Sequence, residues 1–512
     1  MTTTSRPVPI VLCLLLLLLS ASPAAAAKDV HSHTWPNGNR YTGQWHNDVM
    51  HGQGTHWWKD GMKYVGQWRD GHMQGRGLKT WADGRKYEGG FVADKQQGKG
   101  RMTWKNGDSY DGGWRADEMD GLGTYGSAGG AIYAGNWRMG KMHGKGKRTM
   151  PDGVIYDGDW LEDVKHGQGK QSWPEGRVYV GQWSRDQRTG GGTQTWKNGN
   201  RYGGQWLDGK AHGKGTYTWA DGSRYVGQWV HDVRRGLGSY RWPDGGTYEG
   251  QWLDSKMHGK GRRAWKDGGW YDGQWLKDAM TGSGIRHWAQ GGEASGTFLD
   301  GKLHGQGSKT YADGSRHQGQ WQQGLRHGRG IETRANGDKT TGSWVKGKLG
   351  GRVTIDWHDG SRYEGDAKDG VIHGRGVWRL LDGSTYTGPF VNGHQHGRGV
   401  RVWANGNRYE GDFRKGEIVG QGSYQWNGGD RYVGAFSKGL MHGKGRMVWA
   451  DGGAYDGDFV DGQISGRGVR TWKDGSRYVG ELKGGKRHGQ GVMTGPKGER
   501  REGKWRDDEP VG

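Results

Sequence analysis

Histidine recurs along this chain at a spacing that raises the question of metal binding. Imidazole is the commonest protein ligand for transition metals. However, if each 23-residue period forms two strands, neighbours in the series lie about 10 Å apart, whereas metal bonds are about 2 Å long. We therefore expect these side chains to pack or hydrogen-bond in loops. The series comprises His143, His166, His212, His258, His304, His327, His373, His396, His442 and His488.

A denser histidine group lies near the start of the chain and comprises His31, His33, His46, His51 and His56. We predict no metal site there either. The many Gly-x-Gly pairs resemble phosphate loops, but the Gly-x-x-x-x-Gly-Lys-Ser/Thr sequence that binds phosphate does not occur. Serine and aspartate are plentiful in turns, yet neither has a positioned partner that would make it a nucleophile or base. We therefore predict a non-enzymatic protein with no catalytic residue and no cofactor.

The first 27 residues are typical of a signal peptide. Arg6 precedes an apolar run from Ile10 to Leu19, and small residues lead to a predicted cleavage site between Ala27 and Lys28. The apolar run is shorter than the roughly 20 residues of a membrane-spanning helix. The only cysteine, Cys13, lies inside this segment. We expect a soluble mature protein without disulfides, either secreted or in the lumen of the secretory pathway.

Glycine and tryptophan are strongly enriched, with 108 and 31 residues among 512, while only 31% of residues are hydrophobic. This composition does not favour one large core, yet the aromatic content argues against disorder. The enrichment follows a 23-residue period, which runs from Tyr41 to Arg501 in 21 registers without insertion or deletion. Each unit reads Tyr-x-Gly-x-Trp, then Gly-x-Gly, then a second aromatic residue followed by Asp-Gly or Asn-Gly. The sequence therefore predicts a repeat array.

Within each unit the spacing predicts a β-hairpin. Tyr225 and Trp229 fall on one face of a strand because successive side chains alternate, and Gly227 leaves room for their rings. A second strand is expected from Gly213 to Trp219. The Asp-Gly and Asn-Gly pairs predict two-residue type I′ turns. The other connection, such as Leu207 to His212, is expected to be longer and to face water.

The order Tyr-Val-Gly-Gln-Trp, Gly-Leu-Gly and Trp-Pro-Asp-Gly, between residues 225 and 245, resembles the MORN (membrane occupation and recognition nexus) repeat. The resemblance implies an all-β fold, an elongated array of antiparallel 23-residue hairpins that forms a rod or trough. Family members act as scaffolds, dimerisation modules and linkers at membrane or cytoskeletal junctions. We assign residues 28–34 to an N-terminal lead-in, 35–505 to a continuous array of about 20 MORN repeats, and 506–512 to a C-terminal tail.

The aromatic side chains of the repeat are candidates for lining a groove. They alternate onto one face, where ring packing is the only extensive apolar burial that the chain offers. The same residues must therefore hold the array together, and those left exposed are available to partners or sugars. The candidate groove aromatics are Tyr202, Trp206, Trp219, Tyr225, Trp229, Trp242, Tyr248 and Trp252.

Basic residues, which contribute to a net charge of +21, form two ladders on the opposite face. One ladder precedes the tyrosine of the period, and the other fills the gap of Gly-x-Gly. Such a stripe suits anionic lipid or acidic glycan, although acidic neighbours such as Glu88 neutralise part of it. Nucleic acid is not expected, because base-stacking sites interleave aromatic and basic residues and because export is predicted. The candidate basic face comprises Arg40, Lys63, Lys86, Lys214, Arg224, Lys260, Arg375 and Arg398.

The stretch between Gly291 and Asp356 departs from the repeat. Three successive tyrosine positions are occupied by Ala294, His317 and Thr340. Sequence drift is the simpler explanation. The alternative is a bend, a dimer contact or a partner site.

These features predict a secreted or endomembrane repeat scaffold that binds protein partners, with avidity from repetition. Open strand edges also predict self-association, as a homodimer or end to end. One alternative function is anionic phospholipid binding through the basic face. A second is glycan binding at a cell surface through exposed indoles.

Overall fold

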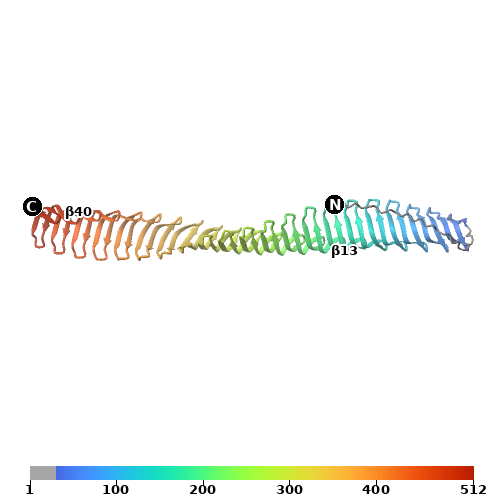
Figure 1. Ribbon diagram of the computed structural model, residues 1–512, viewed down its shortest axis with the longest axis horizontal. Coiled ribbons are helices and arrows are strands. Elements are labelled where there is room, and N and C mark those ends of the chain that lie inside the picture. The colour runs from blue at the N-terminus through green and yellow to red at the C-terminus, as the bar shows by residue number, and fades with distance from the viewer. Residues whose placement is uncertain (1–29) are drawn as a thin grey trace, which may run out of the picture. The chain divides into compact units, whose positions relative to one another are not determined.

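The computed structural model describes residues 30–512, and within this range the chain consists of strands and turns with no helix. The predicted signal peptide, residues 1–27, lies outside the described residues, as does its cleavage site between Ala27 and Lys28. Among residues 30–512 no helix is long and apolar enough to cross a membrane. The chain divides into two compact units, of which unit 1 ends at Ala220 and unit 2 begins at Asp221. In each unit the strands follow one another in chain order (Figure 1).

The strands of the two units alternate between shorter and longer members. In unit 1 they are β1 (Val30–Thr34), β2 (Arg40–His46), β3 (Val49–Trp57), β4 (Lys63–Arg69), β5 (His72–Thr80), β6 (Lys86–Val92), β7 (Lys95–Thr103), β8 (Ser109–Arg115), β9 (Glu118–Gly126), β10 (Ile132–Arg138), β11 (Lys141–Thr149), β12 (Ile155–Leu161), β13 (Val164–Ser172), β14 (Val178–Ser184), β15 (Gln187–Thr195), β16 (Arg201–Leu207) and β17 (Lys210–Thr218).

In unit 2 they are β18 (Arg224–Val230), β19 (Val233–Arg241), β20 (Thr247–Leu253), β21 (Lys256–Ala264), β22 (Trp270–Leu276), β23 (Ala279–His287), β24 (Glu293–Leu299), β25 (Lys302–Thr310), β26 (Arg316–Gln322), β27 (Leu325–Thr333), β28 (Lys339–Val345), β29 (Lys348–Asp356), β30 (Arg362–Lys368), β31 (Val371–Arg379), β32 (Thr385–Val391), β33 (His394–Gln395), β34 (Gly397–Val402), β35 (Arg408–Arg414), β36 (Glu417–Gln425), β37 (Arg431–Ser437), β38 (Leu440–Val448), β39 (Ala454–Val460), β40 (Gln463–Thr471), β41 (Arg477–Lys483), β42 (Lys486–Thr494), β43 (Arg500–Arg506) and β44 (Glu509–Val511).

Within each unit, consecutive strands pair antiparallel and form an open sheet, except that β33 and β34 both pair with β32. In unit 1, β1 pairs with β2 and β2 pairs with β3. In unit 2, β18 pairs with β19 and β19 pairs with β20. Each repeat adds one hairpin to its unit, so the sheet lengthens along the chain. The predicted all-β array of antiparallel hairpins is confirmed.

The Asp-Gly turns differ from the prediction. In the turn that follows β19, the Gly245 N–H donates to the Trp242 carbonyl (3.1 Å) and the Trp242 N–H donates to the Gly246 carbonyl (2.9 Å). Gly245 has φ of 95°, whereas Asp244 does not adopt positive φ. This is a three-residue loop, a type I turn followed by a left-handed glycine, rather than a type I′ turn. The Asp244 carboxylate accepts from the Gly246 N–H at 2.9 Å, so the aspartate serves as an acceptor.

The other connection is the type I′ turn. Between β6 and β7, Val92 pairs with Lys95, which leaves a two-residue loop. Both loop residues, Ala93 and Asp94, have positive φ, of 45° and 70°. Aspartate is one of the few residues that tolerate this conformation, which explains its frequency here.

The longer connection predicted from Leu207 to His212 is therefore wrong. Leu207 pairs with Lys210, and the second strand runs over Lys210–Thr218 instead of Gly213–Trp219. The start of this strand could not be predicted from the alternation of residues, because the strand contains a β-bulge that interrupts the regular pairing.

The bulge is shown clearly between β20 and β21. The register shifts between Gly250 and Gln251, which leaves Gly259 and Lys260 as two extra residues on the longer strand. The Gln251 side-chain oxygen accepts from the Lys260 N–H at 3.0 Å and so spans the irregular position. Because two residues are inserted, the alternation of faces is preserved.

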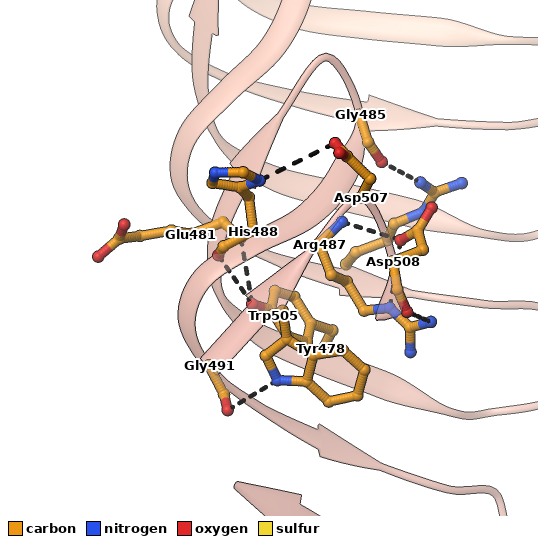
Figure 2. A network of polar contacts seen from close by, with 10 residues as sticks. Tyr478, Glu481, Gly485, Arg487, His488, Gly491, Trp505, Asp507 and Asp508 are labelled. Atoms are coloured by element: carbon orange, nitrogen blue, oxygen red, sulfur yellow. Dashed lines mark hydrogen bonds and ion pairs between the residues drawn. The ribbon is translucent and has the colours of Figure 1, made fainter. Parts of the chain in front are cut away.

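In several repeats a turn aspartate ties the hairpin to the one before it. Near the end of unit 2, the Arg487 N–H donates to Asp508 Oδ1 at 2.8 Å, and the Asp508 N–H donates to the Arg487 carbonyl at 3.1 Å (Figure 2). The Arg487 guanidinium also reaches the same carboxylate, with Nε 3.2 Å from Oδ1. In unit 1, Met73 and Asp94 make the same pair of backbone contacts.

Candidate binding surface

The face that carries the tyrosine of the repeat is called the aromatic face below, and the opposite face is called the basic face. On the aromatic face the tyrosine lies over the paired glycines. Tyr432 is 0% exposed, and its hydroxyl donates to the Ala435 carbonyl at 2.9 Å. A Cβ atom on Gly434 or Gly445 would lie 2.4 or 2.3 Å from that hydroxyl oxygen. The predicted close approach of an aromatic ring to the glycines is confirmed, and burial raises the pKa of Tyr432 to about 12.

Where the first aromatic position of a repeat holds tryptophan, that side chain joins two repeats together. The Tyr248 ring makes edge contacts with Trp252 of its own repeat, at 5.2 Å and 89°, and with Trp275 of the next, at 5.5 Å and 85°. The Trp275 indole Nε1–H donates to the Gly261 carbonyl of the preceding repeat at 2.8 Å. Edge contacts between rings are the favoured aromatic geometry. The tyrosines and first-position aromatics therefore form the core of the array.

Six of the eight predicted groove aromatics belong to this core. The other two, Trp219 and Trp242, occupy the second aromatic position of the repeat and are half-buried. A ligand on the aromatic face therefore meets second-position indoles, and reaches the others only if core side chains move. The six core residues, none more than 7% exposed, are Tyr202, Trp206, Tyr225, Trp229, Tyr248 and Trp252.

Cations interleave with the second-position aromatics in unit 2. The Arg286 guanidinium carbon lies 3.5 Å from the Trp265 ring centroid, and Arg263 lies 4.4 and 5.1 Å from its two neighbouring indoles. Burial lowers the pKa of Arg263, Arg286 and Lys309. All members of this series are half-buried. The series, called the indole–cation ladder below, is Trp242, Arg263, Trp265, Arg286, Trp288, Lys309 and Tyr311.

The indole–cation ladder was not predicted from the sequence, although a signal for it is present there. Arg263, Arg286 and Lys309 each stand two residues before a second-position aromatic, and strand alternation places both members of such a pair on one face. The expected separation of aromatic and basic residues onto opposite faces is therefore incomplete in this stretch.

On the basic face, all eight predicted residues are exposed. Acidic neighbours neutralise part of this face, as expected from the sequence. Arg362 lies 2.8 Å from Glu364 and Arg408 lies 2.7 Å from Glu410. Exposed pairs of this kind contribute little to stability, but they reduce the positive potential of the face.

One part of the basic face keeps unpaired cations. Arg352, Arg375 and Arg398 come from three successive repeats of unit 2 and line one hollow of about 480 Å³. Within residues 30–512 none of the three forms an ion pair with an acidic side chain. Arg375 stands opposite Pro389 across the strand pair, whereas Arg352 and Arg398 stand opposite Asp366 and Asp412.

The histidine series contributes mainly through its backbone. The His488 carbonyl accepts from the Tyr478 hydroxyl at 3.3 Å, and its ring Nδ1 lies 4.0 Å from Asp507 in the next turn (Figure 2). Thr281 supplies the same carbonyl to Tyr271 in a repeat without histidine. In the part of the chain that the structure describes, no group of three or more His, Cys, Asp or Glu side chains could hold a metal ion.

The histidines near the start of the chain are spread among ring contacts. His31 stacks on Trp45 with centroids 4.9 Å apart and an angle of 7° between the rings. His56 is buried against Trp58 at 4.1 Å, and burial lowers its pKa. These side chains pack with indoles rather than converge on a common point.

The stretch that departs from the repeat keeps the hairpin fold through β24 to β29. At Thr340, whose side chain is smaller than tyrosine, Leu349 and Val353 occupy the space over Gly342, each 2.9 Å from where a Cβ would stand. Leu303 covers Gly307 beside Ala294 in the same way. Aliphatic side chains of neighbouring residues therefore fill the space over the glycines that a tyrosine ring fills in other repeats.

His317 takes the place of a tyrosine directly. It is 0% exposed and makes edge contacts with Trp321 and Trp344 at 5.1 and 4.6 Å. Neither ring nitrogen has a hydrogen-bond partner among the described residues. Burial lowers the pKa of His317 to about 4, so the ring is neutral in the folded protein at neutral pH.

Open sheets of similar hairpins with two chemically distinct faces define a β-repeat protein of the class that interacts with proteins or membranes. The chain belongs to the MORN repeat family, whose model matches 19 repeats between residues 41 and 339 and between residues 363 and 500. Between residues 41 and 500 the one unmatched register, residues 340–362, begins at Thr340 in the divergent stretch. Members of this family are generally non-enzymatic.

Among solved structures, the chain is similar to the TCP10 domain of Danio rerio CPAP in complex with a STIL peptide, at 14% identity, 46% of this chain, 99% of that chain and a TM-score of 0.25. It is also similar to the Drosophila melanogaster SAS-4 (dCPAP) TCP domain in complex with a proline-rich motif of Ana2 (dSTIL), at 11% identity, 35% of this chain, 85% of that chain and a TM-score of 0.20. A comparison with curated proteins found no match. At these TM-scores the structural likeness carries no functional argument.

Proposed function

We propose that this chain is a non-enzymatic scaffold that binds protein partners along the aromatic face of its repeats. The observation that carries the proposal is the indole–cation ladder of unit 2. Its half-buried tryptophans and arginines are the residue types that dominate protein–protein binding energy. Because their cationic groups are already partly desolvated, as the lowered pKa of Arg286 reflects, covering them costs less than covering hydrated lysines on an open surface.

Two further features belong to this proposal. Export through the segment 1–27 would place the scaffold outside the cell or in the lumen of the secretory pathway. The outer strand β1 of unit 1 and the outer strand β44 of unit 2 each have one edge that is unpaired within residues 30–512. Such edges favour homodimers or end-to-end association, which light scattering of the full chain would detect as a mass that rises with concentration.

The binding function is tested by quantitative pull-down from the secretory fraction of the host. The paired variant Arg263→Gln and Arg286→Gln removes two cations from the ladder and leaves the indoles. The paired variant Arg224→Gln and Lys260→Gln removes the same charge from the basic face and serves as the matched control. We expect the first pair to reduce recovery of specific partners about tenfold, which corresponds to about 1.4 kcal/mol, and the control to retain them. Equal recovery by both pairs would reject the ladder as the binding surface.

Binding to anionic phospholipid through the basic face is the second candidate function. The hollow lined by Arg352, Arg375 and Arg398 favours it, because three arginines that form no ion pair lie together there, while its two glutamates, Glu364 and Glu410, are paired with Arg362 and Arg408. Each cation near an anionic membrane contributes about 1 kcal/mol. Co-sedimentation with phosphatidylserine vesicles tests this function.

A further inference from the structure

Two successive repeats of unit 1 lack the second-position aromatic residue, with Ser127 and Met150 in its place. The backbone at Ser127 is nevertheless that of the tryptophan turns. The Ser127 N–H donates to the Ala131 carbonyl at 2.8 Å and the Gly130 N–H donates to the Ser127 carbonyl at 2.9 Å. The turn at Trp104 has the same two bonds, at 2.9 and 3.0 Å. The turn backbone is therefore unchanged where the indole is missing, and it does not fill the space that the indole would occupy.

A hollow of about 800 Å³ lies at this place on the aromatic face. Its volume is within the range of about 300–1,000 Å³ that is usual for ligand pockets. The Tyr125 ring stands in its wall, 5.9 Å from Trp104 and 6.1 Å from Trp137. The thioethers of Met119 and Met142 also line it, and methionine adapts readily to aromatic surfaces. The hollow is thus walled by groups that pack well against a planar ring.

The aromatic wall is held in position by hydrogen bonds. The Tyr125 hydroxyl donates to Asp108 Oδ2 at 2.5 Å, and the other oxygen of this carboxylate accepts from the Ala128 N–H at 2.8 Å. Burial, followed by this hydrogen bond, raises the pKa of Tyr125 to about 12. Because the ring is fixed before any ligand arrives, little side-chain entropy is lost on binding.

Arg148 in the same hollow lacks the ring contacts that its equivalents make. The equivalent Arg470 of unit 2 lies 5.1 Å from the indole of its own repeat and 5.1 Å from that of the repeat before. At Arg148 these two positions are Met150 and Ser127. Arg148 therefore has no aromatic ring at the two positions where its equivalents have one, which favours a ligand with an aromatic ring that can make the cation–π contact.

We propose that this hollow binds one aromatic side chain of a partner polypeptide, a tryptophan or tyrosine, which takes the place of the indole that the repeat lacks at Ser127. The inference deepens the proposed scaffold function and rests on it, because it names the anchor residue of a partner. A polypeptide suits the hollow better than a charged small molecule, since Asp83, Arg85 and Lys105 among its lining residues carry both signs of charge. Such a lining complements the amide groups of a peptide backbone.

The proposal is tested with peptides selected from a random library on the full-length chain. We expect the selected peptides to share a tryptophan or tyrosine, and replacement of that residue by leucine to weaken binding at least tenfold in calorimetric titration. Ser127→Trp should fill the hollow with the chain's own indole and weaken binding at least tenfold. Leu380→Trp restores the same repeat position in unit 2, and as the matched control it should leave the affinity unchanged.

Arg148 gives a second readout that does not depend on filling the hollow. Arg148→Gln should weaken binding several-fold, while Arg148→Lys, which keeps the cation, should retain most of the affinity. Peptides without an aromatic residue, or an affinity that Ser127→Trp leaves intact, would overturn the proposal. Equal affinity for N-acetyltryptophanamide alone would also overturn it, by showing a small-molecule site.

The failure of this site is distinguishable from the failure of the proposed function. If host partners depend on Arg263 and Arg286 but bind normally to the Ser127→Trp chain, the scaffold function stands and this site is rejected. If selected peptides depend on Ser127 but no host partner depends on the ladder, the site stands and the ladder is rejected as the binding surface.

Discussion

The close contact between tyrosine and glycine limits what the repeat tolerates, and Gly445→Ala measures that limit. Gly445 does not have positive φ, so alanine can adopt its backbone conformation. The new Cβ would lie 2.3, 2.4 and 2.5 Å from the hydroxyl oxygen, Cε2 and Cζ of Tyr432. The ring cannot shift freely, because Phe436 and Phe459 pack against it at 5.1 and 4.8 Å.

The expected loss of stability follows from two terms. Overpacking of a well-filled core costs about 1–3 kcal/mol, and displacement of the ring breaks the hydrogen bond from Tyr432 to Ala435, which contributes about 1 kcal/mol. Gly445→Ala should therefore cost about 2–4 kcal/mol. Gly452→Ala is the matched control: Gly452 has φ of 94° and no heavy atom within 4 Å of its Cβ position, so only the left-handed backbone is penalised, by about 1–2 kcal/mol.

A double-mutant cycle isolates the contact. Tyr432→Ala alone should cost about 3–5 kcal/mol as a buried aromatic truncation. In that background Gly445→Ala should become nearly neutral, whereas the cost of Gly452→Ala should not change. Native-state hydrogen exchange of amides in β37 and β38 is the suitable assay, because the stability of a repeat protein is set locally by neighbouring repeats. The reasoning is refuted if Gly445→Ala costs no more than Gly452→Ala, or if its cost persists without the ring.

Two further outcomes are expected. The pKa of His317 is about 4 in the folded protein against 6.5 in the unfolded chain, so its contribution to stability is complete above pH 6.5 and is lost as the pH falls towards 4, by at most about 3 kcal/mol. His317→Tyr should remove this part of the pH dependence in urea unfolding at neutral and mildly acidic pH; an unchanged pH profile would contradict it. Replacing Arg352, Arg375 and Arg398 by glutamine should weaken co-sedimentation with phosphatidylserine vesicles about 100-fold, at about 1 kcal/mol per charge, and wild-type binding should fall with salt. Equal binding to phosphatidylcholine vesicles would count against the membrane function.

The sequence predicts the fold well because its period has no insertions and its aromatic residues alternate. The placement of Tyr225, Gly227 and Trp229 on one strand follows from alternation alone. The turn types do not follow, because Asp-Gly occurs in both kinds of turn for different reasons. At Asp244 the side chain accepts a backbone hydrogen bond, whereas at Asp70, in the two-residue turn between Arg69 and His72, the backbone itself is left-handed. Sequence letters do not distinguish these two uses.

The candidate site was harder to predict because strand alternation shows which face of the sheet a side chain lies on, but not how far that side chain is buried. Trp229 and Trp242 share the aromatic face, yet one is core and the other is half-buried. The Tyr225 ring, which is itself 0% exposed, packs on Trp229 at 5.2 Å. The ring that packs on Trp242, at 4.7 Å, belongs to Tyr240, which is only half-buried. Likewise, Ser127 is visible in the sequence as an exception, but its consequence depends on a turn backbone that remains unchanged when the indole is missing.

The indole hydrogen bonds to the preceding repeat have a mechanical consequence. Trp275 and Trp321 of unit 2 make this bond, whereas between Trp344 and Trp505 the first position holds only residues without an N–H donor: Ala367, Phe390, Phe413, Phe436, Phe459 and Leu482. Each missing bond removes about 0.5–1.5 kcal/mol between neighbouring repeats. Under a pulling force the hairpins of this segment should separate at a lower force than the tryptophan-bonded repeats of unit 2. The array therefore contains a segment that extends more easily than the rest.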